Sequence, residues 1–243
     1  MAIKKRPVSP RQKMINLMYV VLMAMLALNV STEVLNGFSI VEESIGRTAA
    51  NASKENQVIY DDFEAQLKAN PAKVKEWFDK AQAVRRMSDS LFNLADELKI
   101  AIVKEADGED GDVKNIEAKD NLEAANQVML APGRGRGGEL YNAINSFRNR
   151  ILAMIDDSAQ KQIISSNLST SIPANAVTMG KNWQEYMFED MPVAGAVTLL
   201  TKLQSDVRYA EGEVLHKLVS NIDLKDIRVN SLNAFVIPNS QTI

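Results

Sequence analysis

Cysteine is absent from this 243-residue chain, and histidine occurs once, at His216. Without cysteine the chain has no disulfide, no thiolate metal ligand and no cysteine nucleophile. A chain without thiols is also compatible with an oxidising compartment, where an unpaired thiol is a liability. One histidine is too few for a histidine-rich metal site, and we expect His216 to be a surface or core-edge residue rather than a ligand.

Net charge and aromatic residues are also low. The formal net charge of −3 is too small to argue for a nucleic-acid partner. Aromatic residues make up 6% of the chain, whereas alanine, leucine, asparagine, lysine and glutamate are common, a bias that favours helix over sheet. No nucleophile–base pair and no metal-ligand cluster is recognisable in the sequence. We therefore expect neither an enzyme nor a cofactor-binding or metal-binding protein.

What the chain does have is an uncharged, largely apolar run, Met14 to Thr32. As a helix this run would extend about 28 Å, close to the ~30 Å of a bilayer core. Ser9, Pro10 and Gln12 form a capping-box start for that helix. The run is preceded by no acidic residue and by five basic ones, Lys4, Lys5, Arg6, Arg11 and Lys13, which indicates a cytoplasmic N-terminus.

We therefore predict a basic cytoplasmic segment (1–13) and a single transmembrane helix (14–32). The alternative is a cleaved signal peptide, which requires a small residue at both positions of a small-x-small cleavage pattern. Asn29 interrupts the best candidates for that pattern. With no second span, the rest of the chain lies outside the cytoplasm, which in a Gram-negative cell is the periplasm.

Polar residues in a membrane span are costly, so each requires a reason. At about 100° per residue, Arg11 and Asn29 share one direction on the helix and Tyr19 lies about 80° from them. Small residues let a second helix approach closely, and the opposite face carries Asn16, Val20, Ala24 and Ala27. The alternative for the polar face is that Arg11 snorkels to the headgroups and Tyr19 is an interfacial aromatic residue.

The segment after the span is predicted to be a helical bundle over residues 33–223. Apolar residues recur every three or four positions in four long segments, which are 34–69, 71–106, 139–157 and 192–222. Pro71 separates the first two segments, because a proline disfavours helix in the residue before it. The spacing in the second segment is close to a heptad repeat, as in bundle helices.

Three loop sequences resemble ligand sites only superficially. The acidic stretch 107–112 (DGEDGD) lacks the order of ligands and glycine in a calcium loop, so we predict a solvated loop. The stretch 133–138 (GRGRGG) is not followed by the Lys-Ser/Thr pair of a phosphate-binding loop, and we predict a connector into a helix. The turn-rich stretch 165–183 contains Pro173 and is predicted to be an exposed loop or a short strand pair.

From Leu224 the pattern changes. The stretch 227–240 (IRVNSLNAFVIPNS) is β-branched and alternating, which is typical of a strand. One or two strands are not stable alone, so we expect residues 224–243 to begin a β-rich domain that continues in a longer protein. The predicted fold class is therefore mainly α: one transmembrane helix, a periplasmic helical bundle and the start of a β-domain.

The stretch SPRQKMINLMYVVLMAMLALNVSTEVLNGF (9–38) closely resembles the N-terminus of the GldM/PorM family of the Bacteroidetes type IX secretion and gliding machinery. The resemblance implies a single-pass inner-membrane protein whose helix pairs with a second copy inside a ring of a small two-span partner, GldL/PorL. It also implies a proton-driven motor, with Arg11 (in PRQKM) and Tyr19 (in NLMY) as its polar membrane residues. Further periplasmic β-domains of the family would reach outer-membrane-associated components.

The expected function is therefore a homodimeric subunit of an inner-membrane motor driven by the proton motive force, with its bulk in the periplasm. Arg11 would pair with a ring carboxylate when that group is deprotonated and release it when it is protonated, and Tyr19 would donate to the same carboxylate or hold a water. Asn16, Val20, Ala24 and Ala27 would pair the two copies. The alternative is an anchored periplasmic scaffold or sensor without motor activity; a sensor would need a cytoplasmic signalling domain, for which about a dozen residues are too few.

Overall fold

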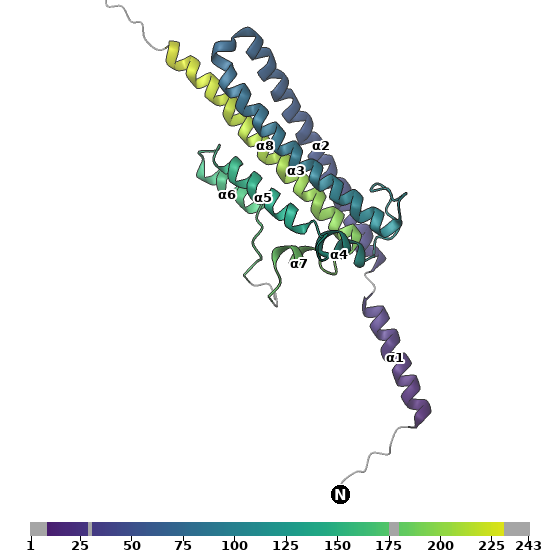
Figure 1. Cartoon of the computed structure of the whole chain (residues 1–243). Coiled ribbons are helices and arrows are strands. Elements are labelled where there is room, and N and C mark those ends of the chain that lie inside the picture. The colour runs from purple at the N-terminus through teal and green to yellow at the C-terminus, as the bar shows by residue number, and fades with distance from the viewer. Residues whose placement is uncertain (1–8, 29–30, 175–179, 231–243) are drawn as a thin grey trace, which may run out of the picture.

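The computed structural model describes residues 9–28, 31–174 and 180–230, with only the backbone described at 24–28 and 223–230. These residues form eight helices and no β-strand. The prediction of a mainly α fold is confirmed for them. The helices divide into three groups, which are an isolated N-terminal helix, a long three-helix bundle and a set of shorter helices packed on one side of that bundle (Figure 1).

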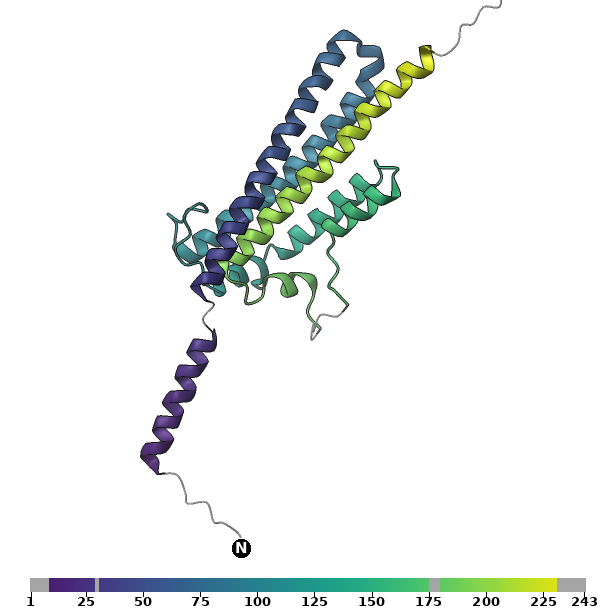
Figure 2. The ribbon, with the colours of Figure 1, turned by 180° about the vertical axis from the view of Figure 1, so that it is seen from behind.

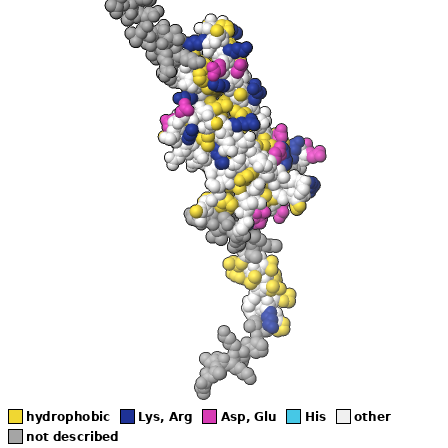
Figure 3. Space-filling model, turned by 60° about the vertical axis from the view of Figure 1, so that its left-hand side comes forward, with side chains coloured by type: hydrophobic (Ala, Val, Ile, Leu, Met, Phe, Trp, Pro, Cys, Tyr) yellow, Lys and Arg dark blue, Asp and Glu magenta, His cyan; other side chains and the backbone are white. Residues whose placement is uncertain are grey.

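The first helix, α1 (Pro10–Leu28), lies outside the bundle, beyond its lower end (Figure 1). It begins as predicted, because the Ser9 hydroxyl accepts a hydrogen bond from the Gln12 amide at 3.3 Å. Its apolar side chains face solvent in this isolated chain, with basic side chains at the far end (Figure 3). Among the described residues, no helix combines the length and the apolar composition that a membrane crossing requires. Asn29 and Val30, within the predicted span, lie outside the described residues.

Three long helices, α2 (Thr32–Ala69), α3 (Pro71–Asp107) and α8 (Val193–Asn230), form the bundle. Ser31 caps α2 by accepting from the Glu33 amide at 3.2 Å. The chain then reverses at Asn70, and Pro71 stands at the first turn of α3, as predicted. Figures 1 and 2 show α8 lying along both α2 and α3, which it contacts over much of their length. A helix of 38 residues is about 57 Å long.

Four shorter helices pack on the lower half of the bundle: α4 (Glu123–Leu130), α5 (Gly137–Leu152), α6 (Ser158–Asn167) and α7 (Trp183–Phe188). The predicted helix 139–157 ends early, because the chain turns at Ala153. Residues 158–167 form a separate helix, which Asp157 caps through the Ala159 amide at 2.8 Å. The predicted loop at 165–183 carries the end of α6 and the start of α7 without a strand in its described part, and residues 175–179 lie outside that part.

The core of the bundle follows a heptad on α3. Its fully or almost fully buried positions fall at alternating intervals of three and four residues, and they are Ala81, Val84, Ser88, Leu91, Ala95, Leu98 and Ile102. One of these positions is polar, since Ser88 is buried with no exposed surface. The predicted near-heptad spacing of this segment is therefore confirmed, while Met87 and Leu94, beside the buried positions, are only half-buried.

The prediction that a β-rich domain begins at Leu224 is wrong for the described residues. Helix α8 continues to Asn230, so residues 224–230 are helical rather than the first part of a strand. Elongating a helix that has already formed adds one hydrogen bond for each residue fixed, which outweighs a weak local strand preference. Residues 231–243, where the rest of the predicted strand falls, lie outside the described residues.

The close contact between α8 and α2 at Gly212 predicts that two glycine substitutions have opposite effects on stability. A Cβ at Gly212 would lie 2.8 Å from the Asn56 side-chain oxygen, whereas a Cβ at Gly37 would meet nothing within 4 Å. Gly37→Ala should raise the free energy of unfolding by about 0.5–1 kcal/mol through helix propensity. Gly212→Ala should lower it by about 1–3 kcal/mol, because Asn56 is held and cannot move aside. Urea unfolding followed by circular dichroism measures both, and equal stabilisation by the two substitutions would contradict this packing.

Candidate functional site

The predicted site residues of the first segment all lie on α1. Arg11, Asn16, Tyr19 and Val20 are exposed, and the exposed fraction of Tyr19 is 65%. The Asn16 side chain accepts from the Gln12 side chain at 3.3 Å. Helical geometry places Val20 about 180° from Arg11, so the structure keeps the predicted pairing and polar positions on different faces.

Arg11 and Tyr19 are not brought together by the fold. They are eight residues apart on one helix, which separates them by about 12 Å along its axis and about 80° around it. The expectation that Arg11 pairs with a ring carboxylate, and that Tyr19 donates to the same carboxylate or holds a water, therefore involves side chains about two helical turns apart. It stays a prediction. Ala24 and Ala27, the other predicted pairing residues, lie within α1, but their side chains are outside the described part.

A second candidate site, which the sequence patterns missed, runs through the bundle. Polar side chains occur at intervals of three or four residues on α8 and point between α2 and α3, where apolar residues are the norm. Each is buried or nearly so. We call this row the polar seam, and it consists of Thr198, Thr201, Gln204, Arg208 and Glu211.

The lower part of the polar seam ties α8 to both neighbours. The Thr198 hydroxyl donates to the Ala194 carbonyl of its own helix at 2.7 Å and lies 3.3 Å from the Phe38 carbonyl of α2. The Thr201 hydroxyl donates to Glu42 of α2 at 2.9 Å. Gln204 accepts from the buried ammonium of Lys99 on α3 at 2.7 Å. These bonds satisfy polar groups that would be costly to bury alone.

The upper part of the polar seam surrounds one carboxylate. Glu211 is 1% exposed and accepts hydrogen bonds from the Tyr60 hydroxyl at 2.7 Å, the Ser88 hydroxyl at 2.8 Å, the Asn56 amide at 3.2 Å and the Arg208 guanidinium at 2.8 Å. Tyr60 and Asn56 belong to α2, and Ser88 belongs to α3. All three long helices therefore meet at this one carboxylate.

The pKa shifts around Glu211 have a common cause. Burial and the negative charge of Glu211 raise the pKa of the Tyr60 hydroxyl, so Tyr60 remains a hydrogen-bond donor at physiological pH. Burial alone would lower the pKa of Arg208, but its bonds to Glu211 and to Asp89 (2.9 Å) outweigh that effect and raise it. The Arg208 guanidinium also lies 4.5 Å from the Phe92 ring centre. The cluster is thus an ion pair that hydrogen bonds from all three long helices hold in place.

Two loop sequences that resemble ligand sites are held by contacts within the chain. The carboxylate of Asp107 accepts from the Glu117 and Ala118 amides at 2.9 and 2.8 Å, which ties the start of the acidic loop to the segment that follows it. In the GRGRGG stretch, Arg136 pairs with Glu139 at 2.8 Å and with Glu97 at 3.2 Å, and its bond lowers the pKa of Glu139. The described residues contain no group of three side chains able to hold a metal.

The hydrogen bonds and the ion pair of the polar seam suit it to holding the long helices in register rather than to catalysis or ligand binding. A satisfied buried polar network fixes which residues face each other, because slipping one helix past another would leave several buried groups unpaired. Two features of the sequence could have indicated the seam. Ser88 occupies a core position of an apolar heptad, and the charged pair Arg208 and Glu211 lies three residues apart on a core-facing stripe.

Comparison with known families gives one match. The sequence profile of the GldM N-terminal domain matches residues 33–221. The matched residues contain almost all of α2, the whole of α3 to α7 and α8 as far as residue 221, so they include the polar seam. A comparison with curated proteins finds no match.

The ion pair of the polar seam predicts a non-additive pair of substitutions. Arg208→Ala should lower the free energy of unfolding by about 3–5 kcal/mol, because it leaves the buried carboxylate of Glu211 without an opposite charge. Adding Glu211→Gln should recover part of that loss, since the amide still accepts hydrogen bonds and carries no charge. The measurement is chemical unfolding of the wild type, the single variants and the double variant.

The matched control for this experiment is Arg47→Ala. The Arg47 side chain is 72% exposed and lies 4.0 Å from Glu43, so its loss should cost well under about 1 kcal/mol. Additive effects of Arg208→Ala and Glu211→Gln would show that the two groups do not depend on each other and would contradict the description of the seam.

Proposed function

The chain belongs to the GldM family, and from this premise we propose that it is a membrane-anchored subunit of a motor driven by the proton motive force. Family membership supports a part in the gliding and type IX secretion machinery. The motor proposal rests on one observation, which is that the chain connects an apolar helix to a long helical bundle. A short apolar helix with Arg11 and Tyr19 on it leads into a long three-helix bundle with a fixed register.

The exposed apolar surface of α1 supports anchoring in the inner membrane. Its hydrophobic side chains have no partner elements in the bundle (Figure 3) and include Met18, which is 69% exposed. A continuous apolar helix surface is stable in lipid or against other apolar helices, not in water. The basic residues before it favour an N-terminus in the cytoplasm, which leaves the bundle in the periplasm.

We assign the two faces of α1 to different partners. The face with Asn16, Val20, Ala24 and Ala27 would pair with a second copy of the chain, because small residues allow close helix packing. The face with Arg11 and Tyr19 would meet a ring of the two-span partner GldL/PorL. The family's further domains, beyond this chain, would contact outer-membrane-associated components.

The proposed coupling uses a carboxylate on the ring. Deprotonated, it would pair with Arg11; protonated, it would lose that attraction and be free to move. Because Arg11 and Tyr19 are about 12 Å apart along the helix, a ring carboxylate would meet them in succession, or two ring subunits would meet one each. The bundle would carry the resulting movement outward, since the polar seam holds α8 in register with α2 and α3.

An anchored scaffold without motor activity is the alternative reading of the same fold. It is favoured by one observation, which is that the bundle is long and its three helices are hydrogen-bonded to one another at its centre, as a spacer would be. The two proposals differ in what they require of Arg11. A scaffold needs only its charge outside the hydrocarbon, whereas a motor needs it to face a titrating group.

Substitution of Arg11 separates these functions. Arg11→Ala should abolish or strongly reduce secretion and gliding, because a charge within ~4–6 Å lowers a carboxylate pKa by about 1–3 units and its loss would keep the ring residue protonated. Tyr19→Phe should impair activity without abolishing it, since it removes one hydrogen bond. Lys13→Ala is the matched control, as it removes a charge on a different face of α1. Wild-type activity of Arg11→Ala with normal assembly would favour the scaffold.

Cysteine crosslinking tests the assignment of faces. The chain has no native cysteine, so a single introduced cysteine reports one position. Cysteine at Ala24 or Ala27 should crosslink two copies of the chain, whereas cysteine at Met18 or Leu22, nearly opposite on the helix, should crosslink to the ring partner when that partner carries a cysteine. The reverse pattern in membranes would show that the two faces are misassigned.

A further inference from the structure

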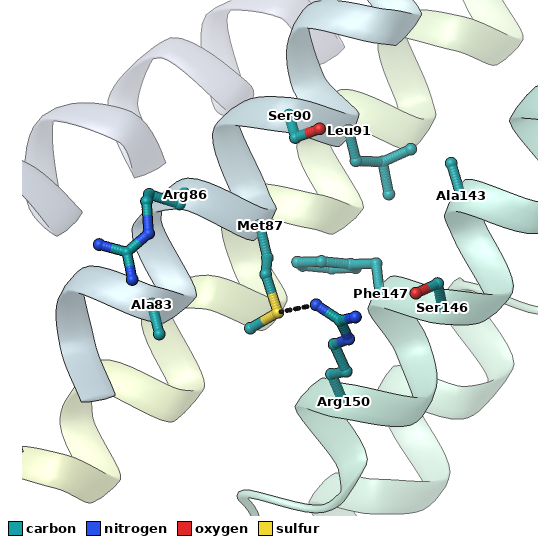
Figure 4. A pocket seen from close by; sticks show the side chains of 9 residues that line it. All are labelled: Ala83, Arg86, Met87, Ser90, Leu91, Ala143, Ser146, Phe147 and Arg150. Atoms are coloured by element: carbon teal, nitrogen blue, oxygen red, sulfur yellow. Dashed lines mark hydrogen bonds between the residues drawn. The ribbon is translucent and has the colours of Figure 1, made fainter. Parts of the chain in front are cut away.

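A groove between α3 and α5 has the composition of a binding site that neither the family match nor the motor proposal uses. Its volume is about 380 Å³. Met87 and Leu91 of α3 and Phe147 of α5 form its apolar floor, and Ala83 and Ala143 leave space above that floor (Figure 4). We call it the α3–α5 groove. It lies between the middle of α3 (residues 83–91) and the C-terminal half of α5 (residues 143–150).

The rims of the α3–α5 groove carry two arginines. Arg86 stands on the α3 rim and Arg150 on the α5 rim, with Met87 between them in the view of Figure 4. Both are exposed, and within the described residues neither pairs with a carboxylate. Arg150 contacts only the Met87 sulfur, at 3.6 Å, a weak acceptor that leaves most of its donors available.

The neighbouring arginines behave differently. Arg85 donates to Gln57 at 2.8 Å and stacks over the Tyr60 ring at 4.8 Å, and Arg148 donates to the Leu168 carbonyl at 3.0 Å. The chain therefore satisfies the guanidinium groups on both sides of the groove and leaves available the two that line it. Exposed hydroxyls of Ser90 and Ser146 add further hydrogen-bonding groups to its edge.

The distance of the α3–α5 groove from the end of the bundle nearest α1 restricts which molecules can bind in it. Met87 is 20 residues from Asp107, the end of α3 nearest α1, which corresponds to about 30 Å along the helix. Lipid headgroups at the level of α1 cannot reach that far. The chain's own acidic loop (107–112) is at the same lower end and is equally distant. A segment of another molecule in the same compartment therefore suits the groove better than lipid or this loop.

We infer that the α3–α5 groove is a docking site for an acidic, amphipathic segment of another protein. The carboxylates of that segment would pair with Arg86 and Arg150, which are suited to bidentate binding of carboxylates. One or two of its apolar side chains would lie on Met87 and Phe147. The inference rests on the proposed function only in expecting that this partner belongs to the same machinery.

Binding of a designed peptide tests the groove directly. The protein is the full chain in detergent, and the probe is a fluorescent 12-residue (~18 Å) helical peptide with leucines at i, i+3, i+4 and glutamates elsewhere; its counterpart has lysine for each glutamate. The glutamate peptide should bind and the lysine peptide should not. Arg86→Glu with Arg150→Glu should weaken binding by about tenfold or more, and so should Ala143→Trp, which fills the groove without changing charge.

Arg134→Glu is the matched control, because Arg134 is an exposed arginine in the loop between α4 and α5. It should leave the affinity unchanged. The reversed arginines are exposed and make no ion pair in the described structure, so helicity and unfolding temperature should be retained. Unchanged peptide binding in the double reversal and in Ala143→Trp, or equal binding of the lysine peptide, would overturn the inference.

Secretion assays in cells test whether the groove is used. Arg86→Glu with Arg150→Glu should reduce secretion while leaving co-purification with the ring partner intact, and suppressors should replace an acidic residue by a basic one in another protein. Wild-type secretion in this variant would overturn the inference. Failure of the motor proposal would be recognised separately, by normal secretion in Arg11→Ala, and would leave peptide binding unaffected.

Discussion

The carboxylate of Glu211 is the constraint on which the bundle depends. A buried, unpaired charge is unstable in a protein interior, so the residues around Glu211 must neutralise and hydrogen-bond it. They do so from three helices at once, through Tyr60 on α2, Ser88 on α3 and Arg208 on α8. Shifting any one of these helices by one residue relative to the other two would break these hydrogen bonds to Glu211. The cluster therefore determines the register of the bundle more strictly than the apolar contacts around it, which tolerate small shifts.

Because of that constraint the helices of the bundle resist sliding, which is useful for transmitting movement. Three helices of nearly 40 residues, joined along a hydrogen-bonded seam, resist sliding along one another as well as bending. α1 precedes α2 in the chain, and α8 leads away at the opposite end (Figure 2). In the proposed motor, the bundle would carry movement between these two ends. The shorter helices brace the lower half and leave the α3–α5 groove beside the long bundle.

Sequence patterns predicted the parts of this structure that are local. The heptad on α3 and the break at Pro71 follow from periodicity and from the geometry of proline. The patterns failed where the structure depends on distant residues: nothing local shows that Ser88 meets Glu211, since the two are 123 residues apart. They also extended α5 beyond its end at Leu152, because a turn without glycine or proline resembles a continuing helix, and they placed a strand preference where α8 continues to Asn230. The separation of Arg11 and Tyr19 along α1 follows from their spacing in the sequence and the rise of a helix.

The central claim is that α2, α3 and α8 behave as one body because of the polar seam. Native-state hydrogen exchange, measured for each amide across a series of urea concentrations, tests it most directly. The account predicts that amides of the three long helices near Tyr60, Ser88 and Glu211 exchange with one common opening free energy, equal to that of global unfolding, while α6 and α7 open at lower cost. An α8 that opens independently of α2 and α3, at a lower free energy of its own, would contradict it.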